Sequence, residues 1–226
     1  MTMETGLREA ATGGVAPRSR STVQRIADLR GATRELARLR PRPRLERLSG
    51  LHNPWGHAAA RTDAWRFLDL CEDPGIVDRV QSAIGPDIVL WDSELHLEAA
   101  SYQRFVDEGR EGRYWPVMPL AGAVVLVAPE QVQPLTCIEL DRVVSGLPSL
   151  DPGEPLYVIR YMPATSHFLR DARAPANWIA MEEQPLINHA VRPLWLVRGE
   201  DRAGNDFVTG FSLLVPRWAG IQPKEH

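Results

Sequence analysis

The sequence predicts a mainly β domain preceded by helices, with an antiparallel sandwich or barrel that carries the helices on one outer face. The apolar period is close to 3.6 residues up to Gly85 and close to two from Ile88 onward, which indicates helices first and strands afterwards. No helix-length segment separates the later apolar runs, so a parallel sheet with alternating helices is not expected. A chain of 226 residues, 44% of them apolar, is long enough to build a real core.

The beginning of the chain is basic. Residues 1–44 contain ten Arg and four acidic residues, a net charge of +6, whereas the whole chain carries −3. Residues 1–22 are rich in small residues and lack an apolar period, so we expect a disordered basic arm before a single domain at 23–226. From Val23 to Leu39 the apolar spacing predicts an amphipathic helix that ends before Pro41. We expect this helix to pack on the outside of the domain. The alternatives are a nucleic-acid or membrane arm, a transit peptide, and docking on a protein partner.

Two further helical segments complete a helical layer that we expect to span about 23–85. The segment 58–70 contains a dense apolar cluster around Trp65 and Phe67. In the next segment Asp73 supplies an N-cap and Pro74 a first-turn proline. The apolar stripe that follows ends at Gly85, a residue typical of helix C-termini.

Six apolar runs with the period of a strand follow, and we expect them to form the sandwich or barrel over about 87–218. Turn-forming segments such as Asp151-Pro152-Gly153 separate them. The predicted strands are Ile88–Glu98, Ala121–Ala128, Cys137–Val143, Leu156–Met162, Pro193–Val197 and Phe207–Val215.

The composition excludes several classes of protein. No apolar run approaches the roughly 20 residues that a membrane helix requires, so no membrane partner is expected. The formal charge of −3 gives no reason to expect nucleic acid. Two cysteines are too few for a disulfide scaffold or a four-cysteine zinc site. The N-terminal segment lacks an apolar signal, so we expect a cytoplasmic protein.

The strand 88–98 is the first candidate site. Its alternation places Asp92, Glu94, His96 and Glu98 on one face and Trp91 on the other. His96 and Glu98 lie two residues apart, the spacing that a facial site of two histidines and one carboxylate uses. His167 or His189 could supply the second imidazole, and the spacing does not select between them; His189 is taken as the candidate. The competing interpretation is a solvated strand face with ordinary surface charges.

A second group of residues favours a ligand pocket. Aromatic residues that follow a polar loop can wall a cavity, and an arginine within an apolar strand needs an internal carboxylate or an anionic ligand as its partner. An internal salt bridge is the alternative for these arginines. The candidates for the pocket are Trp91, Tyr114, Trp115, Arg160 and Arg192.

Several segments, in order, resemble the phytanoyl-CoA dioxygenase-like family. The helix that ends in Gly85-Pro86-Asp87 and leads into a strand with Leu90-Trp91 resembles the corresponding part of that family. Tyr114-Trp115-Pro116 is similar to the Tyr-Trp-Pro that follows the family's first metal motif. Residues 162–167 are similar to its Pro-Gly-Ser-His segment, and the resemblance covers about residues 65–216.

The resemblance implies a double-stranded β-helix, a jelly-roll barrel of the cupin type, with iron(II) and 2-oxoglutarate as cofactors. It implies an oxygenase that acts on a small organic molecule. This chain departs from the metal motif of the family, because Gly109 and Glu111 occupy the positions at which the family's histidine and aspartate are expected. At the position of the distal histidine the chain has Glu183 or Arg198, depending on the register.

Three hypotheses follow from these observations. The first is a divergent oxygenase with a rebuilt metal site made of His96, Glu98 and His189. The second is a metal-free pseudo-oxygenase, which uses the barrel pocket to bind a small molecule or to catalyse a non-oxidative reaction. The third is a structural or partner subunit that docks on another protein through its basic N-terminal helix.

Overall fold

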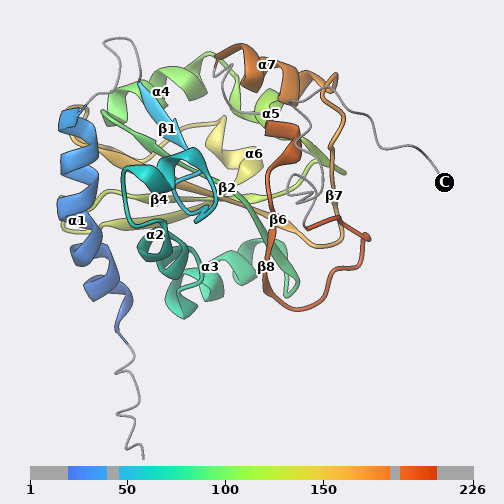
Figure 1. The fold of residues 1–226 in the computed structure, drawn as a ribbon, viewed down its shortest axis with the longest axis horizontal. Helices are drawn as coiled ribbons and strands as arrows, with labels where there is room; N and C mark the ends of the chain where they lie inside the picture. Colours follow the sequence, from blue (N-terminus) through green and yellow to red (C-terminus); the bar gives the residue numbers. More distant parts are fainter. Residues whose placement is uncertain (1–19, 40–45, 184–188, 208–226) are drawn as a thin grey trace, which may run out of the picture.

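In the computed structural model, residues 20–39, 46–183 and 189–207 are described. They form seven α-helices and an antiparallel sheet of six strands (Figure 1). The predicted arm and the predicted strand at Phe207–Val215 fall almost entirely outside these ranges. The domain is therefore mixed α/β rather than mainly β.

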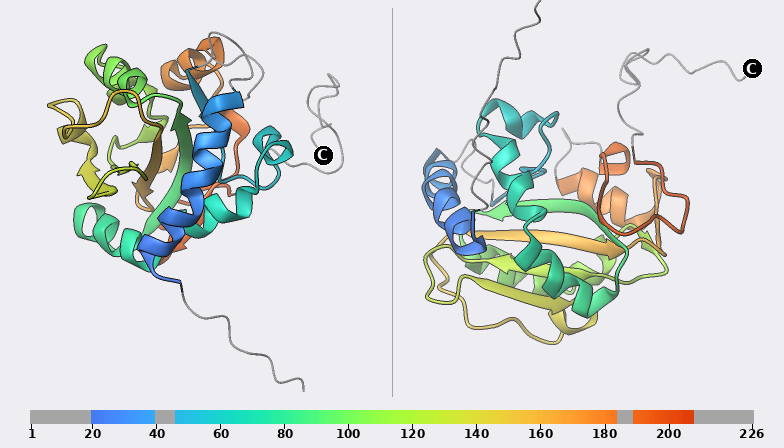
Figure 2. Two further views of the ribbon diagram at one scale, coloured as in Figure 1. Left: turned by 90° about the vertical axis from the view of Figure 1, so that its left-hand side faces the viewer. Right: turned by 90° about the horizontal axis from the view of Figure 1, so that it is seen from below.

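The central sheet is open. Its strands have the order β1 (Arg47–Ser49), β2 (Ile88–His96), β6 (Leu156–Pro163), β4 (Ala123–Val127) and β5 (Leu135–Glu139). β8 (Trp195–Arg198) also pairs with β2, at the end of that strand opposite to β1. Figure 2 shows the two longest strands, β2 and β6, side by side. A separate small sheet joins β3 (Val117–Met118) and β7 (His167–Phe168). The sheet does not close into a barrel, so the predicted double-stranded β-helix is not confirmed.

Helices cover both faces of the sheet, which corrects the expectation of helices on one outer face. One apolar core lies between the sheet and α1 (Thr22–Leu39), α2 (Ala64–Cys71) and α3 (Pro74–Ile84). The other core lies between the sheet and α4 (Ala99–Asp107), α5 (Glu111–Tyr114), α6 (Leu140–Val143) and α7 (Pro175–Glu183). In Figure 1, α4 and α7 lie above the strands and α3 lies below them. The alternating side chains of β4 and β6 supply both cores.

Local sequence signals explain the best-predicted helix. The Asp73 carboxylate accepts a hydrogen bond from the backbone N–H of Gly75 at 2.9 Å, and Pro74 occupies the first turn of α3. The helix ends at Gly85, whose φ of +95° lies in the region that favours glycine. The predicted α1 is also confirmed, since Ile26, Leu29 and Leu36 are buried on one side of it. Among the described helices, none has the length and hydropathy needed to cross a membrane.

Two predicted elements differ in detail. The segment 58–70 is divided into a short 3-10 helix, η1 (His57–Ala60), and α2. The predicted strand Cys137–Val143 is strand β5 only as far as Glu139, where the chain turns into α6. The continuous apolar run hid this change of conformation, because a buried strand and a short buried helix have the same composition.

Candidate functional site

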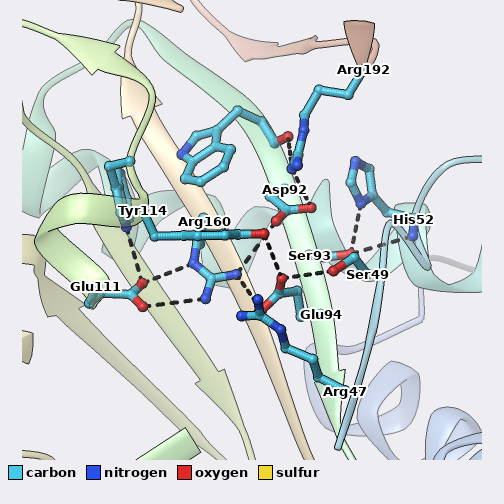
Figure 3. A network of polar contacts seen from close by, with 12 residues as sticks. Arg47, Ser49, His52, Asp92, Ser93, Glu94, Glu111, Tyr114, Arg160 and Arg192 are labelled. Carbon is cyan, nitrogen blue, oxygen red and sulfur yellow. Dashed lines mark hydrogen bonds and ion pairs between the residues drawn. The ribbon is translucent and has the colours of Figure 1, made fainter. Parts of the chain in front are cut away.

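A network of buried charges joins β1, β2, β6 and α5 (Figure 3). Three carboxylates and three guanidinium groups make it up, so their formal charges cancel. Five of these residues are at most 7% exposed, and the Arg192 side chain is 12% exposed. The members are Asp92, Glu94, Glu111, Arg47, Arg160 and Arg192.

Arg160 on β6 is the centre of this network. Its guanidinium approaches both oxygens of Glu111, with Nε 2.9 Å from Oε1 and Nη2 3.4 Å from Oε2. Nη1 lies 3.0 Å from Oε2 of Glu94 and 3.6 Å from Oδ2 of Asp92. Such a fork matches the planar geometry of a carboxylate. The arginine was expected to have either an internal carboxylate or an anionic ligand, and the internal carboxylates are present.

Glu94 on β2 is held by groups from three other elements. Ser49 on β1 donates a hydrogen bond to Oε1 at 2.8 Å, and the Tyr114 hydroxyl donates to the same oxygen at 3.3 Å. Arg47 on β1 lies 3.4 Å from Oε2. Burial opposes ionisation, but Arg160 and Arg47 outweigh it and hold the pKa of Glu94 well below its usual range. Glu94 is therefore a carboxylate at neutral pH.

Asp92 pairs with Arg192, whose Nη1 lies 2.7 Å from Oδ1. Burial raises the pKa of Asp92 above its ordinary value, and the attraction of Arg192 offsets this effect only in part. The carboxyl groups of Asp92 and Glu94, two residues apart on one strand, therefore have pKa values shifted in opposite directions.

Two histidines are buried at β2: His96 is the last residue of the strand, and His52 lies beside it. His52 shares a hydrogen bond of 2.7 Å between Nδ1 and the hydroxyl of Ser93, and burial lowers the pKa of its imidazole to about 3. Nδ1 of His96 lies 2.9 Å from the hydroxyl of Ser101, and Nε2 lies 3.5 Å from Glu94. Burial also lowers the pKa of His96. Both imidazoles are thus neutral at pH 7.

A β-bulge corrects the predicted faces of β2. The pairing of β2 with β6 shifts between Leu90 and Asp92, so that Trp91 packs in the same core as the helices α4 and α5. Asp92, Glu94 and His96 share one face, as predicted, but this face is buried rather than solvated. Trp91 was expected on the opposite face, and the extra residue at the bulge reverses its direction.

The five predicted pocket residues do come together. Trp91 and Trp115 contact each other edge to face, with ring centroids 5.0 Å apart, and Arg160 lies over the rings of Trp91 and Tyr114. Trp115 donates a hydrogen bond from Nε1 to Glu111 at 3.1 Å, whereas Nε1 of Trp91 is buried without a hydrogen-bond partner among the residues that the structure describes. The residues that were predicted to line a ligand pocket therefore belong to a packed ion network in the described part of the chain.

Arg47 and Ser49 were missed from the sequence. They lie on the three-residue strand β1, which is too short to produce an alternating pattern. Glu111 was noticed only as a departure from a family motif. Its burial beside Arg160, 49 residues away in the chain, could not be predicted from local sequence.

The predicted metal ligands do not form a metal site within the described ranges. No group of three His, Cys, Asp or Glu side chains there could hold a metal ion. His96 uses Nδ1 toward Ser101, and Glu98 precedes α4 as its N-cap residue, beyond the end of β2. His189 begins the 3-10 helix η2 (His189–Val191), and its side chain is outside the description. At the family's motif position, Glu111 is bound by Arg160 and Gly109 has no side chain. Within the described ranges, the residues at these positions do not fit iron.

A different group of residues lies at the surface. Trp55 follows β1 in a loop, Trp65 lies on α2, and Trp195 lies on β8. The Trp55 and Trp195 rings are nearly parallel, at 12° with centroids 6.2 Å apart, whereas the Trp65 ring meets Trp55 at 75° and 6.3 Å. Trp55 is 62% exposed and Trp65 57% exposed. We call these three residues the tryptophan surface.

The tryptophan surface is supported from below. The His52 ring meets Trp195 edge to face, with centroids 4.8 Å apart, and is itself 3% exposed. Trp195 also packs against the apolar core of α1, α2 and α3. In the loop, the backbone N–H of Trp55 donates a hydrogen bond to Asn53 Oδ1 at 3.0 Å. Several elements therefore fix these large side chains in place.

The basic helix α1 uses its arginines within the domain. Arg25 lies 3.0 Å from the Asp73 carboxylate, and Arg34 lies 2.6 Å from Glu130. Arg30 donates two hydrogen bonds to the carbonyl oxygen of Pro129, at 3.1 and 2.6 Å. The helix packs on the outside of the domain, as expected, and its charges hold it there.

Fold and site together define a mixed α/β domain with an antiparallel sheet between two helical layers, a buried ion network and an exposed tryptophan surface. The chain matches no model of a known protein family and no curated protein. Membership of the phytanoyl-CoA dioxygenase-like family therefore stays a prediction that rests on the residues quoted above.

Proposed function

We propose that this protein is a binding module that recognises a protein partner through the tryptophan surface. The observation that carries the proposal is the gathering of Trp55, Trp65 and Trp195 from three separate elements with two of the rings more than half exposed. Large aromatic side chains cost free energy when they are left in water, and tryptophan is the residue type most enriched among binding hot spots. This proposal retains the third hypothesis from the sequence but moves the docking surface from α1 to the tryptophans.

The interior supports the same proposal. Each carboxylate of the ion network is held by a guanidinium group at 3.0 Å or less: Glu111 and Glu94 by Arg160, and Asp92 by Arg192. Glu94 is a poor base, because Arg160 and Arg47 hold its pKa low. A carboxylate that is already paired with a guanidinium group is also a poor metal ligand. The oxygenase activity, its iron(II) and 2-oxoglutarate, and a small-molecule ligand remain predictions without a supporting arrangement in the described residues.

The test compares three forms of the full chain as bait in extracts of the cells that encode it. These are the natural sequence, the double variant Trp55→Ala/Trp65→Ala and the control Trp178→Ala. Trp178 on α7 is 55% exposed and is therefore a matched loss of exposed aromatic area outside the tryptophan surface.

We expect one stoichiometric partner to be retained by the natural chain and by the control. After purification, it should bind the double variant at least about tenfold more weakly. Circular dichroism should show all three forms equally folded, because exposed side chains contribute little to stability. Equal affinity of the partner for the natural chain and the double variant would refute the proposal.

A further inference from the structure

The size of the tryptophan surface limits what can occupy it. A whole tryptophan side chain offers about 250 Å². The exposed parts of Trp55 and Trp65 therefore amount to about 300 Å², given their exposed fractions of 62% and 57%. A stable interface between folded subunits buries about 800 Å² on each partner. The surface is thus smaller than one side of such an interface and is suited to a short segment.

The ring geometry offers two flat surfaces at an angle. Trp55 and Trp195 lie nearly parallel and provide one plane, and Trp65 stands at 75° to Trp55. Flat rings in such a corner suit ligands that present compact apolar rings of their own. An amphipathic helix would need anchors over several turns, at i, i+4 and i+7, and hence a longer groove.

Two ion pairs lie beside the tryptophans. On α2 and just before it, Arg66 lies 3.2 Å from Asp63. On β8, Arg198 lies 2.7 Å from Asp78 of α3. The opposite charges of these pairs offset each other, and an uncharged ligand segment complements them better than an acidic or basic one.

We infer that the occupant is a short, extended, proline-rich segment of the partner in the polyproline II conformation; this inference rests on the proposed function. Such a segment is already ordered before it binds, so a small contact area is sufficient to hold it. Its proline rings are uncharged and flat enough to pack on tryptophan faces, the way in which aromatic grooves recognise proline-rich peptides.

The experiment uses capped decaproline as the probe and a glycine-serine peptide of equal length as the control ligand. Binding is followed by NMR at the indole N–H signals of the full chain labelled with ¹⁵N, with Trp55, Trp65, Trp195 and Trp178 assigned through single variants. We expect saturable shifts at the three residues of the tryptophan surface and none at Trp178. The variant Trp55→Ala should weaken the binding of decaproline at least about tenfold, and Trp178→Ala should leave it unchanged.

Three results would overturn the inference. The first is the absence of shifts with decaproline while the purified partner still binds in a manner that depends on Trp55; in that case the proposed function stands. The second is decaproline binding that Trp55→Ala leaves unchanged. The third is self-association of the natural chain in sedimentation experiments that Trp55→Ala abolishes, since the occupant would then be a second copy. Failure of the proposed function would give a different result: the purified partner would bind the natural chain and the double variant Trp55→Ala/Trp65→Ala with equal affinity.

Discussion

The buried imidazole of His52 predicts a loss of stability in mild acid. The ring is 3% exposed and its pKa is lowered from 6.5 to about 3 by burial, with Arg192 adding to the effect. Below pH 6.5 the unfolded chain takes up a proton at this residue while the folded chain does not, so the unfolded state gains stability as the pH falls. At pH 5, which is 1.5 units below 6.5, the folded state loses about 2 kcal/mol from His52 alone. The contribution is fully present above pH 6.5, and the loss grows down to about pH 3.

The measurement is urea denaturation at pH 8 and pH 5 for the natural chain, His52→Asn and His167→Asn. The asparagine amide can keep a hydrogen bond to Ser93, so the first variant removes the titrating group with limited damage. We expect the stability lost between the two pH values to be about 2 kcal/mol smaller in His52→Asn than in the natural chain. The exposed His167 is the control, and its variant should lose as much as the natural chain. Equal losses in all three proteins would refute the argument, as would an NMR titration of His52 with a midpoint near 6.5.

Three further predictions concern the core and the cofactors. Replacing Arg160 by Met leaves buried carboxylates uncompensated, and urea denaturation should show a free energy of unfolding that is lower by about 3–5 kcal/mol. The control is Arg142→Met, at a side chain that is 73% exposed, and it should change the free energy of unfolding by less than about 0.5 kcal/mol. Gly122→Ala should cost about 1–3 kcal/mol in the same assay, because its Cβ would lie 2.6 Å from the carbonyl oxygen of Tyr161, and Gly112→Ala, with open space around it, is the control. Elemental analysis after anaerobic loading should find far less than one iron per chain; one tightly held iron, with a melting temperature raised by 2-oxoglutarate, would restore the oxygenase hypothesis.

Local signals made part of the fold predictable. The N-cap at Asp73, the first-turn proline at Pro74 and the glycine at Gly85 act within a few residues of one another, and the helix between them was predicted to the residue. The long strands β2 and β6 were predicted for the same reason, since their alternating or continuous apolar runs are local features. The arrangement of these elements in space depends on contacts between distant parts of the chain, and local signals do not reveal it. Helices α4 and α7 place a second layer on the sheet, and the strand pattern had given no reason to expect it.

The candidate site shows the same division. The row Asp92, Glu94 and His96 on one face of β2 follows from the period of a strand and was predicted correctly. Its burial depends on Arg160 from β6 and on Arg47 from β1, which approach from distant parts of the chain. The bulge beside Trp91 has no characteristic amino-acid composition that would reveal it in the sequence. One extra residue in a strand is nevertheless enough to move a side chain to the other face of the sheet. A polar strand face was therefore interpreted as solvated when arginines from other strands had made its burial possible.

The placement of the two groups of residues separates folding from binding in this domain. The ion network joins β1, β2, β6 and α5 in the interior, so substitutions such as Arg160→Met act on the folded state as a whole. The tryptophan surface lies on the opposite side of β2, and its exposed rings contribute little to the core.

His52 is the link between the two sides, because it contacts Ser93 on β2 and Trp195 at the surface. His52→Asn should therefore be the variant that changes both properties: it should lose part of the acid sensitivity and also loosen Trp195. Its affinity for the partner should then fall less than that of Trp55→Ala, because the two exposed rings remain in place. If His52→Asn reduced binding as severely as Trp55→Ala at pH 8, then the position of Trp195, rather than the exposed area of Trp55 and Trp65, would be the main source of affinity.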